Sequence, residues 1–205
     1  MTRQTVLLGV ITVCSVILFS GCMSYTTLQS PKTLEPAEVI LGAGFSKPLE
    51  VDSKGFMYEF NSRVGIVNRF DVGAKFVMGA LYFFDGKYQI LKEPISVSAD
   101  LGWSYYSYDG DIGVSHGTTT AWYPMIIAGQ EQWYVALKRV YLMTETEIEL
   151  LGSQEFSGSG WYSTNIVAGV VLGKDIRLIP ELNYIIPQGS GKGFFVPAIG
   201  LQFVL

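Results

Sequence analysis

Ten ionisable side chains stand at alternate positions of otherwise apolar stretches, and they are the residues whose types and spacing allow chemistry. Five are acids and five are bases: Glu59, Asp71, Asp85, Asp100 and Glu181 against Arg63, Lys75, Lys87, Lys138 and Arg177. Opposite charges in equal number favour ion pairs, because an unpaired ion at low dielectric is strongly destabilising. The pattern predicts a paired polar core; its alternative is a narrow, weakly selective pore.

The stretches that carry these ions form ten runs rich in Val, Ile, Tyr, Phe and Leu, separated by turn residues. We expect strands near 38–47, 57–67, 70–78, 80–91, 95–106, 119–128, 132–142, 161–172, 175–186 and 193–205. No segment after the N-terminal region has a convincing period of 3.6 residues. At 144–151 we expect one helical turn within a loop. The predicted class is all-β.

Alternation within the runs separates an apolar face from a polar one, because successive strand residues point to opposite sides of a sheet. In 95–106, Leu101 and Trp103 share one side, and Ser98 and Asp100 share the other. Two barrels fit this pattern. In a soluble, lipocalin-like barrel the apolar face points inward around an apolar ligand. In a transmembrane barrel it meets lipid, and the polar face fills the interior.

Three features favour the transmembrane barrel. The polar face carries few charges and many glycines, as suits a narrow interior: Gly42, Gly44, Gly65, Gly73, Gly102, Gly169 and Gly200. Tyr and Trp gather near the strand ends, as in the girdles at membrane interfaces. Short links near 68–69, 92–94, 129–131 and 173–174 alternate with longer ones near 48–56, 107–118, 143–160 and 187–192. We therefore predict an antiparallel up-and-down transmembrane β-barrel of about ten strands.

The N-terminus has the features of a secretory signal, with Arg3 ahead of an apolar run from Val6 to Phe19. The residues before Cys22, Leu18-Phe19-Ser20-Gly21, resemble the bacterial lipoprotein signal, which implies acylation of Cys22, for example with palmitate. A plain cleaved signal and an uncleaved helix are alternatives, although the run is shorter than the ~20 residues that span a bilayer. The expected organisation is a lipoprotein signal peptide at 1–21, a lipidated tether at 22–37 and a β-barrel domain at 38–205.

The stretch 63–75, followed by 86–89, resembles the hairpins of small bacterial outer-membrane β-barrel proteins, and the chain ends with Phe203 and Leu205 at alternate positions. The resemblance implies an outer-membrane location, with the bilayer, the barrel assembly machinery and the lipoprotein sorting machinery as partners. An even strand number places both barrel ends in the periplasm, so the anchor is expected on the periplasmic side.

Composition argues against several functions. Only 16% of residues are charged, and a net charge of -4 provides no basic field for nucleic acid. One histidine and one cysteine after cleavage form no zinc site, and we expect no metal or cofactor. The glycine-rich pieces 157–160 and 189–193 lack the strand-to-helix setting of a phosphate loop.

The function favoured is therefore a structural or surface-interaction role in the outer membrane, with an extracellular partner at the outer loops as a candidate. The alternatives are a soluble or peripheral barrel lipoprotein that binds an apolar ligand, a narrow pore, and a loop-based hydrolase. The hydrolase would use His116 with Ser115, Asp109 and Asp111. No nucleophile motif frames Ser115, so we do not expect an enzyme.

Overall fold

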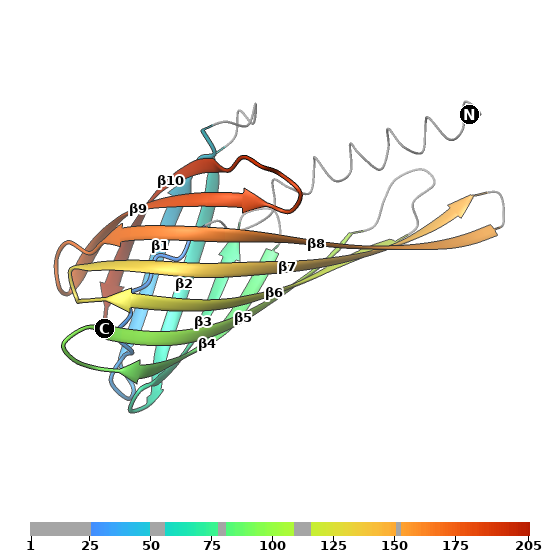
Figure 1. Ribbon diagram of the computed structural model, residues 1–205. Coiled ribbons are helices and arrows are strands. Elements are labelled where there is room, and N and C mark those ends of the chain that lie inside the picture. The colour runs from blue at the N-terminus through green and yellow to red at the C-terminus, as the bar shows by residue number, and fades with distance from the viewer. Residues whose placement is uncertain (1–25, 50–55, 78–80, 109–115, 151–152) are drawn as a thin grey trace.

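The computed structural model describes residues 26–49, 56–77, 81–108, 116–150 and 153–205. They form a closed antiparallel barrel in which each strand pairs with the next and the last pairs with the first (Figure 1). The ten strands are β1 (Val39–Ser46), β2 (Met57–Val67), β3 (Phe70–Val77), β4 (Leu81–Leu91), β5 (Ser96–Tyr108), β6 (His116–Gly129), β7 (Trp133–Leu150), β8 (Ser153–Val170), β9 (Ile176–Pro187) and β10 (Phe194–Val204). None of these residues belongs to a helix long and apolar enough to cross a bilayer.

The two ends of the barrel differ in their connections. Tight links join β2 to β3, β4 to β5, β6 to β7 and β8 to β9 at one end, which we call the short-turn end. The barrel closes along β1, which pairs with β10 from Ile40↔Val204 to Ser46↔Ala198, and at the short-turn end the Leu205 amide donates to the Val39 carbonyl at 2.8 Å. The opposite end is the long-loop end. The predicted all-β class and the ten-stranded antiparallel barrel are confirmed.

The prediction of a loop at 143–160, with a helical turn at 144–151, is wrong. The strands β7 and β8 continue as a regular ladder from Met143↔Gly160 to Leu150↔Ser153. The reason lies in the sequence Thr144-Glu145-Thr146-Glu147-Ile148-Glu149, where β-branched residues alternate with glutamates. That period of two suits a strand, and Thr and Ile favour strands over helices.

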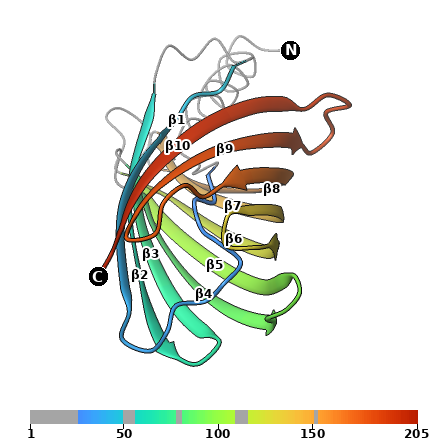
Figure 2. The same ribbon diagram turned by 90° about the vertical axis from the view of Figure 1, so that its left-hand side faces the viewer.

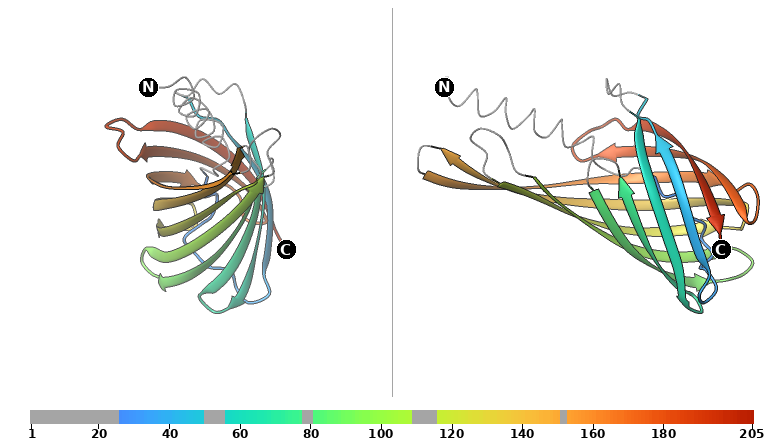
Figure 3. Two further views of the ribbon diagram at one scale, coloured as in Figure 1. Left: turned by 90° about the vertical axis from the view of Figure 1, so that its right-hand side faces the viewer. Right: turned by 180° about the vertical axis from the view of Figure 1, so that it is seen from behind.

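The β7–β8 hairpin consequently extends far beyond the rest of the barrel at the long-loop end (Figures 1 and 3). Each of its strands has 18 residues, whereas about 10 tilted residues cross a bilayer. The pairs between β8 and β9 run only from Ser163 to Gly169. The outer part of the hairpin is therefore unpaired on its β9 side, whereas β6 pairs with β7 out to His116↔Glu147.

The faces of the strands are those of a membrane barrel. Leu101, Phe84 and Leu137 point outward and are 55%, 53% and 56% exposed, while Asp71 and Lys87 inside are at most 1% exposed. A lipocalin-like barrel would place these two sets the other way round. The structure therefore contradicts the facing that the soluble, apolar-ligand-binding alternative requires.

An aromatic row on the outer surface marks one edge of this apolar band. Trp103, Trp122, Tyr141 and Tyr162 are successive cross-strand partners on β5, β6, β7 and β8. Such rows occupy the interface between lipid and water. The row lies toward the long-loop end, and the β7–β8 hairpin continues beyond it.

Candidate functional site

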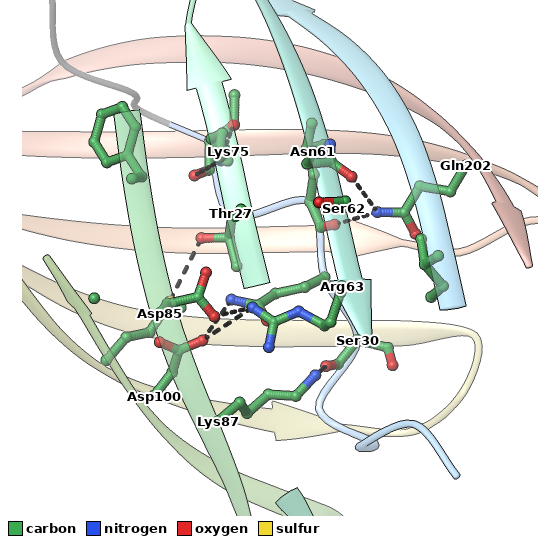
Figure 4. Close-up of a pocket in the computed structure, with 18 of the residues that line it drawn as sticks. Thr27, Ser30, Asn61, Ser62, Arg63, Lys75, Asp85, Lys87, Asp100 and Gln202 are labelled. Atoms are coloured by element: carbon green, nitrogen blue, oxygen red, sulfur yellow. Dashed lines mark hydrogen bonds and ion pairs between the residues drawn. The ribbon is translucent and has the colours of Figure 1, made fainter. Parts of the chain in front are cut away.

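The barrel interior is the candidate functional site, and nine of the ten ions singled out in the sequence meet there in two groups. The first group surrounds the guanidinium of Arg63 (Figure 4). Its Nη1 donates to Asp71 and its Nη2 to Asp85, and Nη2 lies 3.6 Å from Asp100 Oδ2. Lys87 adds a second cation, with Nζ 3.4 Å from Asp71 Oδ2. Three carboxylates therefore face two cations.

Strand register explains why these residues meet. Asp71, Lys87 and Asp100 are direct cross-strand partners on β3, β4 and β5, so their charges alternate along one row of the interior. Directly opposite Arg63 on β3 stands Gly73. A Cβ at that position would lie 2.7 Å from both Arg63 Nη2 and Asp85 Oδ2. The glycine leaves the space that the ion pair occupies.

The second group comprises Glu59, Lys75, Lys138 and Glu181, and it gathers around a segment of chain rather than around another ion. Lys75 Nζ lies 3.4 Å from Glu59 Oε1. Lys75 and Lys138 both donate to the Thr26 carbonyl, at 3.1 and 3.2 Å. Glu181 accepts the amides of residues 27 and 28 at 2.8 and 2.7 Å.

The segment Thr26–Leu34, which lies within the predicted tether, runs through the barrel interior (Figure 2). Thr26 and Leu28 are 3% and 2% exposed. The Leu28 carbonyl accepts from Gln202 at 2.7 Å, and the Leu34 amide donates to Asp71 at 3.0 Å. We call this segment the luminal segment. Residues 26–34 are therefore bound inside the barrel and are not a free tether.

The direction of the luminal segment follows from its contacts. Thr26 bonds to Glu59 and Lys75, which lie toward the long-loop ends of β2 and β3. Leu34 reaches Asp71 at the opposite end of β3, and Ala37 then donates to the Gly65 carbonyl at 2.9 Å. The chain thus descends from the long-loop half to the short-turn end before it enters β1.

Glycines of the wall make room for this chain. A Cβ on Gly44 would lie 2.5 Å from Leu28 Cδ1, and one on Gly200 would lie 3.1 Å from the same side chain. A Cβ on Gly65 would lie 2.0 Å from the Glu35 carbonyl oxygen. The interior glycines therefore accommodate the luminal segment as well as converging wall side chains.

Arg177 is the one predicted ion that stands apart from both groups. Its Nε donates to the Lys174 carbonyl at 2.9 Å, at the short-turn end. Ser115, Asp109 and Asp111 of the hydrolase alternative lie outside the described residues, and of His116 only the backbone is described, at the start of β6.

The interior also contains uncharged residues that sequence reasoning missed. Tyr134 donates its hydroxyl to Glu181, and Asn183 donates to the same carboxylate at 2.9 Å. Their signal was available, because both occupy the polar-facing parity of their strands. The luminal segment itself had no such signal, since Pro31 and Pro36 made it read as a tether.

A cavity of about 80 Å³ is bordered by both the luminal segment and the first ion group, which is room for a few water molecules. Among the described residues, no group of three or more His, Cys, Asp or Glu side chains is arranged to hold a metal ion. The arrangement can hold a peptide segment by charge and hydrogen bonds.

Comparisons with known proteins concern architecture alone. No protein-family model matches the chain, and no curated protein sequence matches it. Among solved structures, the N-terminal β-barrel domain of Pseudomonas aeruginosa OprF is 10% identical with a TM-score of 0.33, and the match covers 84% of this chain and all of that one.

Two further structures are similar in the same sense. Ail, the attachment invasion locus protein of Yersinia pestis, is 8% identical with a TM-score of 0.39, over 84% of this chain and all of Ail. Neisserial surface protein A is 11% identical with a TM-score of 0.30, over 81% of this chain and 95% of that protein. The chain is a small, closed, ten-stranded barrel with outer-membrane barrel proteins among its structural neighbours.

Proposed function

We propose that this protein is a lipid-anchored outer-membrane barrel whose interior is closed by its own luminal segment, and that it has a structural or surface-interaction role. One observation carries the proposal: the backbone of residues 26–28 is hydrogen-bonded inside the barrel to Glu181, Lys75 and Lys138. Charged partners make hydrogen bonds about twice as strong as neutral ones. The segment is therefore held as part of the folded barrel.

A closed interior is favoured over a pore on two grounds. The nine interior ions stand close to opposite charges or to the luminal backbone, and the cavity beside the luminal segment is small, about 80 Å³. Ten-stranded barrels are also too narrow for the wide aqueous channel of much larger porins. A barrel that conducts nothing acts through its surfaces, and the β7–β8 hairpin offers one such surface because it continues beyond the aromatic row. We assign the protein no catalytic role.

Conductance in planar bilayers tests the closed interior. The wild type should show no stable channel. Gly44→Leu places a side chain where Leu28 lies and should expel the luminal segment, which produces discrete openings. Gly102→Ala is the matched control, because its Cβ would make only ordinary contacts at 3.4 and 3.5 Å, and it should stay silent. Steady conductance by the wild type would overturn the proposal.

Acylation of Cys22 remains part of the proposal, and Cys22 lies outside the described residues. The even strand number led to the expectation of a periplasmic anchor, with residues 22–37 as the tether to the barrel. Thr26 lies toward the long-loop ends of β2 and β3, and four residues span at most about 14 Å. These facts support an anchor at the long-loop side, in the outer leaflet.

An epitope inserted between Ser24 and Tyr25 distinguishes the two sides. We expect antibody to label intact cells, with folding verified by heat-modifiable migration on a gel. Labelling only after permeabilisation would restore the periplasmic anchor. Metabolic labelling with a palmitate analogue, lost in Cys22→Ala, tests acylation separately.

A further inference from the structure

One charged side chain interrupts the lipid-facing surface. Arg139 lies on β7 with the outward parity of Leu137 and Tyr141. Among the described strand residues it is the only charged residue at an outward-facing position between the aromatic row and the short-turn end. An arginine exposed to lipid costs about 2–4 kcal/mol at the midplane and less near the interface. A partner that stabilises the guanidinium is therefore needed to offset the cost of placing Arg139 at this position.

The protein supplies part of that compensation. The Arg139 guanidinium carbon lies 4.2 Å from the ring centre of Tyr162 and 5.7 Å from that of Tyr141. Its Nη1 donates to Thr164 Oγ1 at 3.2 Å. The two tyrosines belong to the aromatic row, so they hold the guanidinium directed toward the water interface. Aromatic faces stabilise a cation in this way.

The protein does not supply a counter-charge. Within the described part of the chain no carboxylate forms an ion pair with Arg139, and its Nε is buried without a hydrogen-bond partner. A guanidinium presents a planar fork of donors that matches phosphate oxygens, often in bidentate fashion. The backbone of Arg139 lies two residues from the aromatic row on the hydrocarbon side, and its long side chain, stacked on Tyr162 of that row, can reach phosphates at the interface.

We propose that Arg139, held by Tyr141, Tyr162 and Thr164, is a binding site for the phosphate of an anionic membrane lipid in the leaflet at the long-loop end. The inference rests on the membrane barrel of the proposed function and is independent of the luminal segment. In an outer membrane two sources carry this chemistry: the phosphomonoesters of lipid A and the phosphodiester of phosphatidylglycerol.

Native mass spectrometry of the refolded full chain tests the site. The detergent-solubilised protein is titrated separately with lipid A, phosphatidylglycerol, phosphate-free diacylglycerol and inorganic phosphate. We expect the wild type to retain a phosphate-bearing lipid and not diacylglycerol. Arg139→Gln should reduce that retention at least fivefold, and Arg139→Lys should reduce it less. The arm with the larger loss identifies the lipid source.

The control is Arg177→Gln, which makes the same chemical change at an arginine near the short-turn end and should leave retention unchanged. Equal retention by the wild type and Arg139→Gln would overturn the site, as would binding of inorganic phosphate without lipid. Heat-modifiable migration reports the barrel separately. If lipid is not retained but the protein still shows heat-modifiable migration and no channel conductance, the lipid site is wrong and the proposed function is unaffected.

Discussion

At the scale of single residues, Arg63 forms ion pairs with three carboxylates inside the barrel. It compensates Asp71, Asp85 and Asp100, and it is the only one of the two cations in that group that contacts all three. Removing one partner of a buried ion pair leaves an uncompensated charge, which typically lowers the free energy of unfolding by about 3–5 kcal/mol. The first ion group thus depends on this side chain.

We therefore expect Arg63→Gln to lower the free energy of unfolding by ~3–5 kcal/mol. Urea unfolding in lipid vesicles, followed by tryptophan fluorescence, measures the change. Arg177→Gln should shift it by no more than ~0.5 kcal/mol. A stability for Arg63→Gln equal to that of the wild type would show that the carboxylates are compensated by other means.

The Lys32–Glu131 pair at the short-turn end offers a contrast. Its atoms lie 2.8 Å apart, but the two side chains are 51% and 75% exposed. The mutual hydrogen bond raises the pKa of Lys32 and lowers the pKa of Glu131. The Glu131 carboxylate therefore stabilises the fold at pH values above the ordinary pKa of a glutamate. This stabilisation is lost as the pH falls through the lowered pKa. The Lys32 ammonium stabilises the fold at pH values below the ordinary pKa of a lysine. This stabilisation is lost as the pH rises through the raised pKa.

Solvent screening keeps this contribution small. We expect Lys32→Ala to change the free energy of unfolding by less than ~1 kcal/mol near neutral pH. The difference from the wild type should vanish in high salt and at a pH low enough to protonate Glu131. Unfolding curves at several pH values and salt concentrations measure it. A difference that persists at acid pH would assign Lys32 a role other than this pair.

At the scale of elements, one tight turn requires a glycine. Gly173, between β8 and β9, has φ of +97°, and a Cβ there would lie 2.1 Å from the Ile176 carbonyl oxygen. Gly191, in the β9–β10 connection, has nothing within 4 Å of its Cβ position. Substituting alanine at each of these two glycines compares the effect of an added Cβ on stability where space is absent and where it is open.

Gly173→Ala should lose ~1–3 kcal/mol of stability, because the strained backbone and the contact with carbonyl oxygen both oppose it. Gly191→Ala should be close to neutral. Urea midpoints of the two variants measure the difference. Equal midpoints would mean that the turn adopts another conformation at little cost.

The elements were predictable to unequal degrees. Strands and facing follow from alternation, which is why Leu101 and Asp100 were assigned correctly to opposite faces. The length of β7 and β8 was missed because the run of glutamates and threonines lacks the apolar face used to recognise strands. That face is needed only where a strand meets lipid, and the hairpin has left the lipid there.

At the scale of the whole molecule, the outward apolar band is the feature that makes this chain a membrane protein. Leu101 stands in that band on β5, 55% exposed. Leu101→Arg should weaken folding into the bilayer by ~2–4 kcal/mol near the midplane. The measurement is the urea dependence of folding into lipid vesicles, read by heat-modifiable migration.

The control for this substitution is Gln132→Arg, in the exposed link between β6 and β7, which adds the same charge outside the bilayer and should fold normally. Normal insertion of Leu101→Arg would mean that this surface does not face lipid. The delipidated Cys22→Ala protein should likewise resist extraction from membranes by carbonate, because the strands hold it there.

The sequence by itself determined the class, the ten strands and which side chains face inward, because these properties follow from a local period of two. It also predicted five inward acids and five inward bases, of which the structure brings together the five acids and four of the bases, with Arg177 apart. Only the tertiary structure decided that residues 26–34 occupy the interior, because their contacts with Glu181, Asp71 and Gln202 span from 37 to 174 positions along the chain. No local pattern encodes contacts at such separations. Barrel closure alone brings the glycines and charged groups of distant strands around one extended segment.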